Sequence, residues 1–452
     1  MTANQSSRVA WIFLVALSAL LGTWFLSKHS QPPQDKLIIA IAEIDGTNLS
    51  GKIIANLNSN FKDHREIEMT RISEATAPAQ GSGYARSLGK KLSADFVVWG
   101  YLENSNVVVR VENLTSWKIV PRVTTLRPRI TLADLETFAF QQSAGGDTSA
   151  LVAFLSGLIE YQSQNYEAAV AQFDKALAGA NQFEVYFKRA SAYARLKKYD
   201  LAIQDLNQAL ALNSQSAPAF ANRGWVYNEI RQFERAVPDL DKALALDPQL
   251  ALAYNNRGWS YTELKRYDLA IQDLDKALAL EPQNAWAYNN RGNAYYYIQP
   301  ERAIQDYDKA LEIDPQFFWA YNNRGNAYYN LKQYERAIQD YDQAIELDPS
   351  FARAYNNRGN AYDSLKQVER AIQDYDKSIQ LDAQFASAYN NRGWAYNELG
   401  RYDLAIPDLD KAIELDPQYA LAYSNRGLAH QKLGNLAQAQ ADFAKYAELL
   451  RR

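Results

Sequence analysis

Apolar residues recur with the spacing of paired helices over about the last two thirds of the chain. In residues 320–349, which read AYNNRGNAYYNLKQYERAIQDYDQAIELDP, one stripe comprises Ala320, Tyr321, Ala327, Tyr328 and Leu331. A second stripe comprises Ala337, Ile338, Tyr341, Ala344 and Ile345. Spacings of three and four residues place each stripe on one face of a helix. The pattern therefore predicts two helices, here called helix A and helix B, that pack through these faces.

The motif NRG repeats this unit along the chain. Its glycines are residues 224, 258, 292, 325, 359, 393 and 427, which are 33 or 34 positions apart. Extending the register backwards places Ala190 and Gly157 in the same slot. A period of this length is typical of a solenoid of helix pairs. The sequence predicts nine repeats that begin near residues 150, 183, 217, 251, 285, 318, 352, 386 and 420.

The copy at residues 320–349 resembles the tetratricopeptide repeat family at nearly every diagnostic position. The resemblance extends over residues 150–452. It implies a mainly α fold, a right-handed solenoid of nine helix-turn-helix repeats. It also implies that one face of the A helices lines a concave groove that binds extended peptides or partner helices.

Glycine and proline have structural explanations in each repeat, when positions are counted from the first residue of the repeat. A glycine inside a helix costs about 1 kcal/mol relative to alanine, so the glycine at position 8 predicts close approach of helix B at the alanine of position 20. This glycine, the tyrosine and the aliphatic part of the arginine in YNNRG are predicted to have a structural role in packing the two helices. Repeat five lacks one residue in the turn YIQPERA (297–303), where Pro300 is expected to stiffen the turn and change the curvature. Prolines are expected to end helix B at residues 248, 282, 315, 349 and 417.

The other stripe of helix A, at positions 2, 5, 6, 9, 12 and 13, is rich in asparagine and aromatic residues. Side-chain amides both donate and accept hydrogen bonds, so they could hold a peptide backbone, and tryptophans supply apolar anchors. In the alternative interpretation the asparagines hydrogen-bond between repeats, or were copied by duplication. The predicted partner-binding residues are Trp225, Asn255, Asn256, Trp259, Trp286, Asn289, Asn290, Asn293, Tyr296, Trp319, Asn322, Asn323, Asn326, Tyr329, Asn356, Asn357, Asn360, Asn390, Asn391 and Trp394.

A different pattern precedes the repeats. After a polar tail at residues 1–8, residues 9–26 carry no charge and are long enough as a helix to span a bilayer core. Small residues are not suitably placed after this run for signal-peptide cleavage. The sequence therefore predicts an uncleaved membrane anchor, followed by a linker at residues 27–35. The bulk of the chain is expected outside the cytoplasm, in a bacterial cell envelope, although the flanking charges do not fix the orientation.

Residues 36–115 predict a small βαβαββ domain. Its expected elements are strands at 36–45 and 67–72, helices at 48–61 and 83–93, and a hairpin at 95–114 that turns at Glu103–Asn106. Residues 116–149 form a connector, in which 131–142 is expected to be helical. The small domain resembles the amino-terminal α/β domain of TolB-type cell-envelope proteins through Ala85, Leu88, Gly89, Leu92, Ala94, Asp95, Val98 and Gly100.

Composition argues against several kinds of site. The net charge of −4 does not favour nucleic-acid binding, and the absence of cysteine with only three histidines does not favour a metal centre. GTNLSGKI (46–53) resembles a phosphate-binding loop, but Ile53 stands where Ser or Thr would hold magnesium. Asp306 with Asp308 and Asp340 with Asp342 are expected on a solvated helix face. We predict no catalytic residue, no cofactor and no metal.

The sequence therefore predicts a non-enzymatic, membrane-anchored scaffold that binds a protein or peptide partner in the concave groove. A self-associating structural component of the envelope is one alternative. A nucleotide-binding protein that uses residues 46–53 is another.

Overall fold

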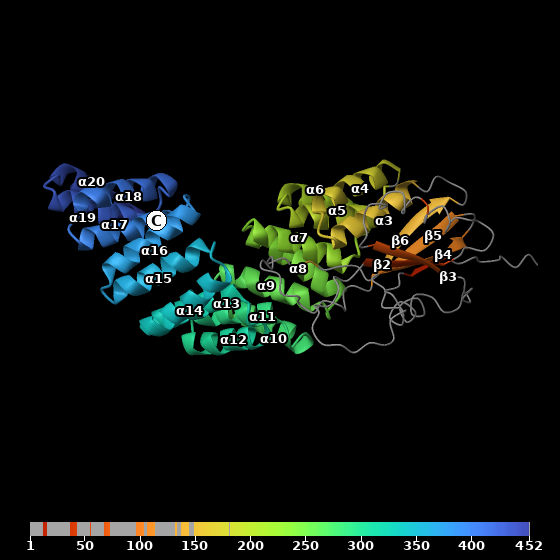
Figure 1. Cartoon of the computed structure of the whole chain (residues 1–452), viewed down its shortest axis with the longest axis horizontal. Coiled ribbons are helices and arrows are strands. Elements are labelled where there is room, and N and C mark those ends of the chain that lie inside the picture. The colour runs from red at the N-terminus through yellow and green to blue at the C-terminus, as the bar shows by residue number, and fades with distance from the viewer. Residues whose placement is uncertain are drawn as a thin grey trace, which may run out of the picture. The chain divides into compact units, whose positions relative to one another are not determined.

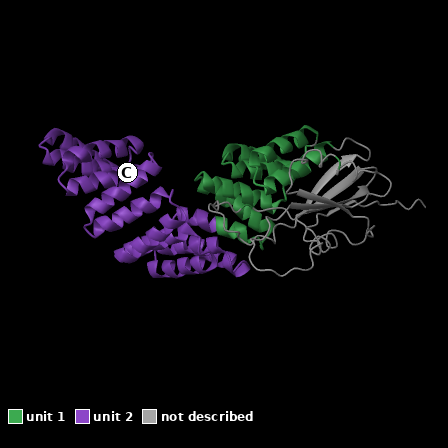
Figure 2. Cartoon of the chain, in the orientation of Figure 1, with its two compact units in different colours: residues 1–122, 129–256 green, residues 123–128, 257–452 purple. Residues whose placement is uncertain are grey.

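The computed structural model describes residues 149–179 and 181–451, the backbone of six strands nearer the amino terminus, and the single residues Ala55 and Leu132 (Figure 1). The chain divides into two compact units (Figure 2). The first comprises residues 1–122 and 129–256, and the second comprises residues 123–128 and 257–452. The boundary falls inside helix α9, which contributes residues to both units.

The six strands form one sheet in the order β1-β3-β2-β4-β5-β6, in which β1 also pairs with β4. Strand β2 is parallel to β3 and β4, whereas β1, β5 and β6 pair antiparallel with their neighbours. Glu103 pairs with Asn106 at the end of the β4–β5 hairpin, where the sequence predicts the turn. The strands are β1 (Ile12–Val15), β2 (Leu37–Ala42), β3 (Ile67–Ile72), β4 (Phe96–Glu103), β5 (Asn106–Asn113) and β6 (Thr137–Ser143).

Four predicted strands, β2 to β5, are present within their predicted ranges. Parallel pairing of β2 with β3 and β4 needs crossover connections, which is where the sequence predicts helices at 48–61 and 83–93. Of these two segments the structure describes only Ala55, which is helical. The complete α/β domain and its resemblance to TolB-type proteins stay predictions. The phosphate-loop-like residues 46–53 lie outside the described residues.

Two expectations for the amino-terminal part differ from the structure. The helix expected at 131–142 is wrong, because Thr137–Ser143 form strand β6 on the free edge of β5. The alternation of Phe138 and Phe140 with smaller residues suits a strand, and backbone pairing along β5 outweighs the local helical pattern. Ile12–Val15, inside the expected anchor 9–26, form strand β1 instead of helix. Within the described residues, no helix has both the length and the apolar character needed to cross a bilayer.

Eighteen described helices form the nine predicted pairs, including the first two pairs, which lack the NRG motif. An acidic residue and a proline follow five B helices, α8, α10, α12, α14 and α18, and each helix ends before them. For example, α14 ends at Leu347, before Asp348 and Pro349. The A helices are α3 (Ser149–Gln162), α5 (Phe183–Arg195), α7 (Ala217–Glu229), α9 (Ala251–Glu263), α11 (Ala285–Tyr296), α13 (Phe318–Asn330), α15 (Ala352–Ser364), α17 (Ala386–Glu398) and α19 (Ala420–Lys432). The B helices are α4 (Tyr166–Gly179), α6 (Tyr199–Leu212), α8 (Phe233–Leu246), α10 (Tyr267–Leu280), α12 (Pro300–Ile313), α14 (Tyr334–Leu347), α16 (Val368–Leu381), α18 (Tyr402–Leu415) and α20 (Leu436–Leu449).

The glycine at position 8 lets helix B approach helix A, but the contacting residue differs from the expected alanine. A Cβ atom on Gly325 would lie 2.7 Å from Cε1 of Tyr341, and one on Gly224 would lie 2.7 Å from Cγ of Leu240. Both contacts are closer than real Cβ atoms show. The alanine of position 20 contributes only its backbone carbonyl, as Ala236 does 3.3 Å from the Cβ site of Gly224. A bulky side chain in the middle of helix B therefore fills the space that the glycine leaves.

The arginine of the NRG motif forms ion pairs in addition to packing its aliphatic part. In repeat six the Arg324 guanidinium donates from Nε and Nη2 to the two oxygens of Asp340, at 2.8 and 2.6 Å. From Nη1 it also donates to Asp308 of the preceding repeat. The guanidinium therefore binds helix B of its own repeat in a bidentate manner and helix B of the repeat before. We call this arrangement the arginine bridge.

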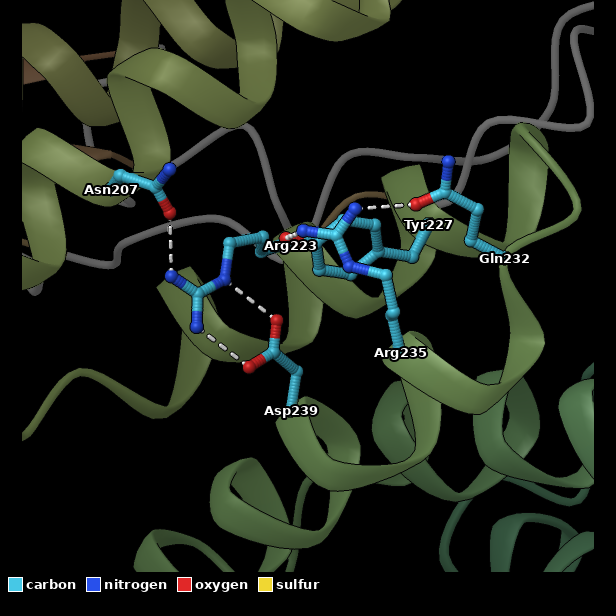
Figure 3. A network of polar contacts seen from close by, with 6 residues as sticks. All are labelled: Asn207, Arg223, Tyr227, Gln232, Arg235 and Asp239. Carbon is cyan, nitrogen blue, oxygen red and sulfur yellow. Dashed lines mark hydrogen bonds and ion pairs between the residues drawn. The ribbon is translucent and has the colours of Figure 1, made fainter.

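The arginine bridge recurs in both units. In the first unit Arg223 binds Asp239 in the same bidentate manner, and Asn207 takes the place of the second aspartate at 2.6 Å (Figure 3). A second contact group in that view joins Arg235 to Gln232 and to the Tyr227 hydroxyl, at 2.7 and 2.9 Å. The remaining bidentate bridges join Arg189 to Asp205, Arg257 to Asp273, Arg291 to Asp306, Arg358 to Asp374, Arg392 to Asp408 and Arg426 to Asp442.

The bridge corrects the expectation that the paired aspartates lie on a solvated face. Asp306 and Asp340 are buried, and their partners Asp308 and Asp342 bind the arginine of the following repeat. Burial raises the pKa of the Asp340 carboxyl even though Arg324 acts to lower it. Because desolvation offsets much of the attraction in a buried ion pair, we infer that the bridge acts chiefly by fixing the register of the helices.

Replacing Arg324 by lysine is expected to destabilise the protein, because an ammonium cannot make the bidentate contact and also reach Asp308. Breaking a buried ion pair typically costs about 3–5 kcal/mol, and the retained lysine charge should reduce this to about 2–3 kcal/mol. Urea denaturation followed by circular dichroism measures the change. The matched control is Lys309→Gln, which removes an exposed ion pair with Glu312 and should leave the midpoint unchanged. Equal midpoints for Arg324→Lys and the native chain would show that the bridge is dispensable.

Candidate functional site

The helix A face is the surface formed by positions 2, 5, 6, 9, 12 and 13 of successive A helices. In the second unit these helices contact one another in series, as α11 with α13, α13 with α15, α15 with α17 and α17 with α19. In the first unit α3 contacts α5 and α5 contacts α7. Every residue of the predicted site lies on an A helix, and three of them, Asn255, Asn256 and Trp259, lie on α9.

The asparagines of YNNRG are held inside the chain. Asn289, Asn322, Asn356 and Asn390, at position 5, are buried. Their side-chain oxygens accept hydrogen bonds from the position-6 asparagine of the following repeat. The bonds run from Asn323 to Asn289 at 2.9 Å, and from Asn357 to Asn322, Asn391 to Asn356 and Asn425 to Asn390 at 3.0 Å each. The amides therefore form a ladder between repeats, as the alternative interpretation of the sequence proposes.

The ladder continues through the asparagines at position 9. The Asn357 amide also donates to Asn326 at 3.0 Å, and the Asn391 amide also donates to Asn360 at 2.9 Å. Both N–H groups of Asn357 and of Asn391 are thus used within the chain. Asn255, Asn256 and Asn290 are buried as well. These amides have little remaining capacity to donate to a peptide backbone.

The residue type at position 9 of helix A varies together with the residue type in the middle of helix B. Where position 9 is asparagine, helix B carries a tyrosine whose hydroxyl donates to it: Tyr307 to Asn293, Tyr341 to Asn326 and Tyr375 to Asn360, all at 2.8 Å. Where position 9 is tryptophan, helix B carries a leucine. The tryptophans 225, 259 and 394 accompany Leu240, Leu274 and Leu409. In both kinds of repeat the tyrosine or leucine of helix B contacts the position-8 glycine.

The tryptophans differ widely in exposure. Trp225 is only 1% exposed and lies edge-on to Tyr199 at 6.3 Å, whereas Trp394 is 36% exposed. Trp259 is half-buried. Trp286 packs on Phe317 with ring centroids 4.4 Å apart, and Trp319 packs on Phe351 at 4.6 Å. Trp225 is therefore a core residue, and Trp394 is the tryptophan most available to a partner among those predicted.

Tyr296 and Tyr329, at position 12, are half-buried. The Tyr329 hydroxyl lies 3.0 Å from the Ser364 hydroxyl of the next repeat, and its ring lies 5.4 Å from that of Tyr334. Burial raises the pKa of Tyr296. Both tyrosines thus join neighbouring elements while keeping part of their surface on the helix A face.

Two groups on this face were not predicted. Phe317, Phe351, Phe385 and Tyr419 precede successive A helices, and an aromatic residue at this one position in four repeats is a signal that the sequence offered. The Arg353 guanidinium lies over the Trp319 ring, 6.0 Å from its centroid.

The second group is a pair of carboxyl groups. Burial and the neighbouring Glu398 carboxylate raise the pKa of Asp363 to about 6, while Lys366 binds Glu398 at 3.0 Å. The two acids belong to different repeats, so no single helix pattern brings them together. In the described part of the chain, no group of three or more His, Asp or Glu side chains is arranged to hold a metal ion.

Replacing Asn356 by alanine is expected to lower the free energy of unfolding by about 1–3 kcal/mol, because the half-buried Asn391 amide loses one of its acceptors and the ladder is interrupted. Chemical denaturation of the variant and the native chain measures this change. Gln339→Ala, an exposed change on α14, is the control and should have no effect. An unchanged midpoint for Asn356→Ala would mean that the ladder contributes nothing to stability.

Comparisons with known proteins agree with this architecture. Family models described as the TPR repeat match residues 258–298, 299–332, 325–366 and 393–434. Models described as the tetratricopeptide repeat match residues 183–216, 217–250, 240–272, 352–385, 374–406 and 420–449. A comparison with curated protein sequences gives no match.

Solved structures with related folds share little sequence. The crystal structure of the APC/C hetero-tetramer Cut9-Hcn1 is 17% identical with a TM-score of 0.51, and the match covers 62% of this chain and 55% of that chain. The protein thus spans about half the length of that relative, and the likeness shows the fold alone.

Two further structures match with lower TM-scores. A tetratricopeptide repeat protein from Parabacteroides merdae is 19% identical over 56% of this chain and 100% of that chain, with a TM-score of 0.48. MamA is 31% identical over 35% of this chain and 96% of that chain, with a TM-score of 0.31. The family models match without interruption over residues 183–449, more than half of the chain, and this protein therefore belongs to the tetratricopeptide repeat family.

Proposed function

We propose that the protein is a non-enzymatic scaffold that binds an extended segment or a helix of a partner protein on the helix A face. The observation that carries the proposal is the combination of Trp394, which is 36% exposed, with the half-buried Trp286 and Trp319 on one series of A helices. Tryptophan is among the residues that dominate binding energy at protein interfaces. Membership of a repeat family that binds proteins supports the same conclusion.

The asparagine ladder gives this face a role different from the one predicted. Asn322, Asn356 and Asn390 are buried in bonds between repeats, so they hold the A helices in register instead of binding a partner backbone. A face whose side chains are already ordered loses little conformational entropy on binding. In this mechanism the tryptophans supply the contact area and the ladder keeps their spacing fixed.

Charge on the face favours specificity. Arg353, near the start of α15, is exposed over Trp319, and Asp363, near the end of the same helix, lies beside Glu398 of α17. A partner segment on α15 and α17 would therefore meet a positive charge at one end of these helices and, at the other end, two carboxyl groups of which Glu398 is paired with Lys366. Complementary charge on the partner selects its direction and increases the rate of association more than it increases affinity.

Replacing Trp394 by alanine is expected to weaken partner binding about tenfold or more, as for a residue at the centre of an interface. Proteins captured by the full chain from cells that produce it are identified by mass spectrometry, and the affinity of the captured partner is then measured by calorimetry. The matched control is Leu404→Ala, which removes a 45% exposed side chain from helix B of the same repeat and should leave the affinity unchanged. Equal affinities for Trp394→Ala and the native chain, with both folded, would exclude the tryptophan as an anchor.

Membrane attachment is a second part of the proposal and rests on the sequence alone. Residues 9–26 carry no charge, whereas strand β1 takes Ile12–Val15 into the sheet. If the segment spans a bilayer, membranes washed at alkaline pH should retain the full chain and release a chain that begins at residue 27. Release of both chains would instead favour the strand. Placement in a bacterial cell envelope, and self-association as an alternative function, stay predictions.

A further inference from the structure

Side chains at positions 12 and 13 join successive A helices in the second unit. Position 12 of repeat five meets position 13 of repeat six, where Asn330 hydrogen-bonds the Tyr296 side chain. Position 12 of repeat six meets position 13 of repeat seven, where the Tyr329 and Ser364 hydroxyl groups lie 3.0 Å apart. Neither pair contains a group that titrates near neutral pH. These two junctions are therefore held by hydrogen bonds between uncharged groups.

The same two positions hold a pair of acids between repeats seven and eight. Asp363, at position 12 of α15, is hydrogen-bonded to Glu398, at position 13 of α17. Two ionised carboxylates offer only acceptors, so this hydrogen bond requires a proton on one of them. The Oδ1 atom of Asp363 is buried and has no hydrogen-bond partner in the part of the chain that the structure describes. The contact is therefore complete only when the pair carries a proton.

A single cation accompanies the two acids. The Lys366 Nζ lies 3.0 Å from a Glu398 carboxylate oxygen, and the Lys366 backbone N–H donates to the Asp363 carbonyl at 2.8 Å. When both acids are ionised, the three side chains together carry one net negative charge. One proton makes the group neutral and supplies the missing hydrogen-bond donor. Charge balance and hydrogen bonding thus both favour the singly protonated pair.

The helices packed against α15 do not supply a second cation to Asp363. Of the described residues, Glu398 from α17 and Lys366 from the turn after α15 act on it by charge. Tyr375 of α16 also lies near Asp363, with Tyr329 of α13 beside it, and burial raises the pKa of Tyr375, so its hydroxyl stays neutral. Burial and the Glu398 carboxylate raise the pKa of Asp363 to about 6, while Lys366 acts to lower it. The closed contact thus keeps a proton that a solvated aspartate would lose near pH 4.

We propose that Asp363 and Glu398 form a pH-sensitive contact, which holds α15 to α17 while they share a proton and loosens when the proton is lost. Loss of the proton leaves two carboxylates side by side with one cation, and it leaves the Asp363 carboxylate buried without a donor. Trp394 lies one helical turn before Glu398 on α17, so the contact also affects the order of the helix that carries this exposed tryptophan. The proposal concerns the junction between two repeats and does not depend on partner binding.

Opening of this contact is expected to become more favourable as the pH rises. The folded contact binds the proton more tightly than the opened one, because the pKa of Asp363 is raised to about 6 in the folded chain and returns to about 4 in the opened state. Opening therefore releases a proton between these two values, and the contact loses stability as the pH rises through them. From pH 5 to pH 7.5 the opening equilibrium should increase about tenfold.

The test is hydrogen exchange of the full chain, measured by mass spectrometry at pH 5 and pH 7.5. The native chain and Asp363→Asn are compared at the same pH, so the intrinsic pH dependence of exchange cancels. The amide of the variant donates to Glu398 at either pH and needs no shared proton. The ratio of the native exchange rate to the variant rate, in peptides from α15 and α17, should be about tenfold larger at pH 7.5 than at pH 5.

Two further variants and an internal control make the result specific to this contact. Glu398→Gln also places one amide donor between the helices and should give the same change in ratio. Glu346→Gln removes an exposed acid from α14 and should exchange like the native chain at both pH values. Peptides from α11 and α13, whose junction is uncharged, should show the same ratio at pH 5 and pH 7.5. A ratio for α15 and α17 that does not change with pH, in both Asp363→Asn and Glu398→Gln, would overturn the proposal.

Discussion

The packing of each repeat on its neighbour depends on an arginine that binds two B helices at once. Arg324 is held by both oxygens of Asp340 and also by Asp308, and the same geometry recurs in both units. Because a planar guanidinium binds a carboxylate in one orientation, the bridge allows one register of helix A on helix B. The close approach at Gly325, with Tyr341 in the space that a Cβ would fill, is compatible with that register.

The asparagine ladder depends on the same register. Asn357 reaches both Asn322 and Asn326 only because consecutive A helices are placed at a constant offset. Buried amides are costly when unpaired, so the ladder penalises any slip of one helix past the next. Both polar systems use side chains of helix A, the arginine at position 7 and the asparagines at positions 5, 6 and 9.

We propose that partner binding uses side chains that take no part in these two polar systems. On the helix A face these are chiefly tryptophans, of which Trp394 is the most exposed and Trp225 is covered. In the A–B turn of repeat five, which lacks one residue, Tyr297 is 62% exposed. Regular repeats thus supply an ordered frame within each unit, and we propose that departures from regularity supply the surfaces by which partners are distinguished.

The sequence by itself determined the repeats and their helices, because apolar spacing, position-8 glycines and prolines are local signals that recur every 33 or 34 residues. It also located strands β2 to β5. Tertiary structure alone decided which polar residues are buried and which groups they bind. Asp340 looked solvated and is buried, because its partner Arg324 lies sixteen positions away on another helix. Asn357 looked available for a ligand and is bound to the preceding repeat. Thr137–Ser143 became a strand because the edge of β5 was free to pair. A polar side chain forms hydrogen bonds with whichever group the packing of the chain brings near it, and helical periodicity does not specify that group.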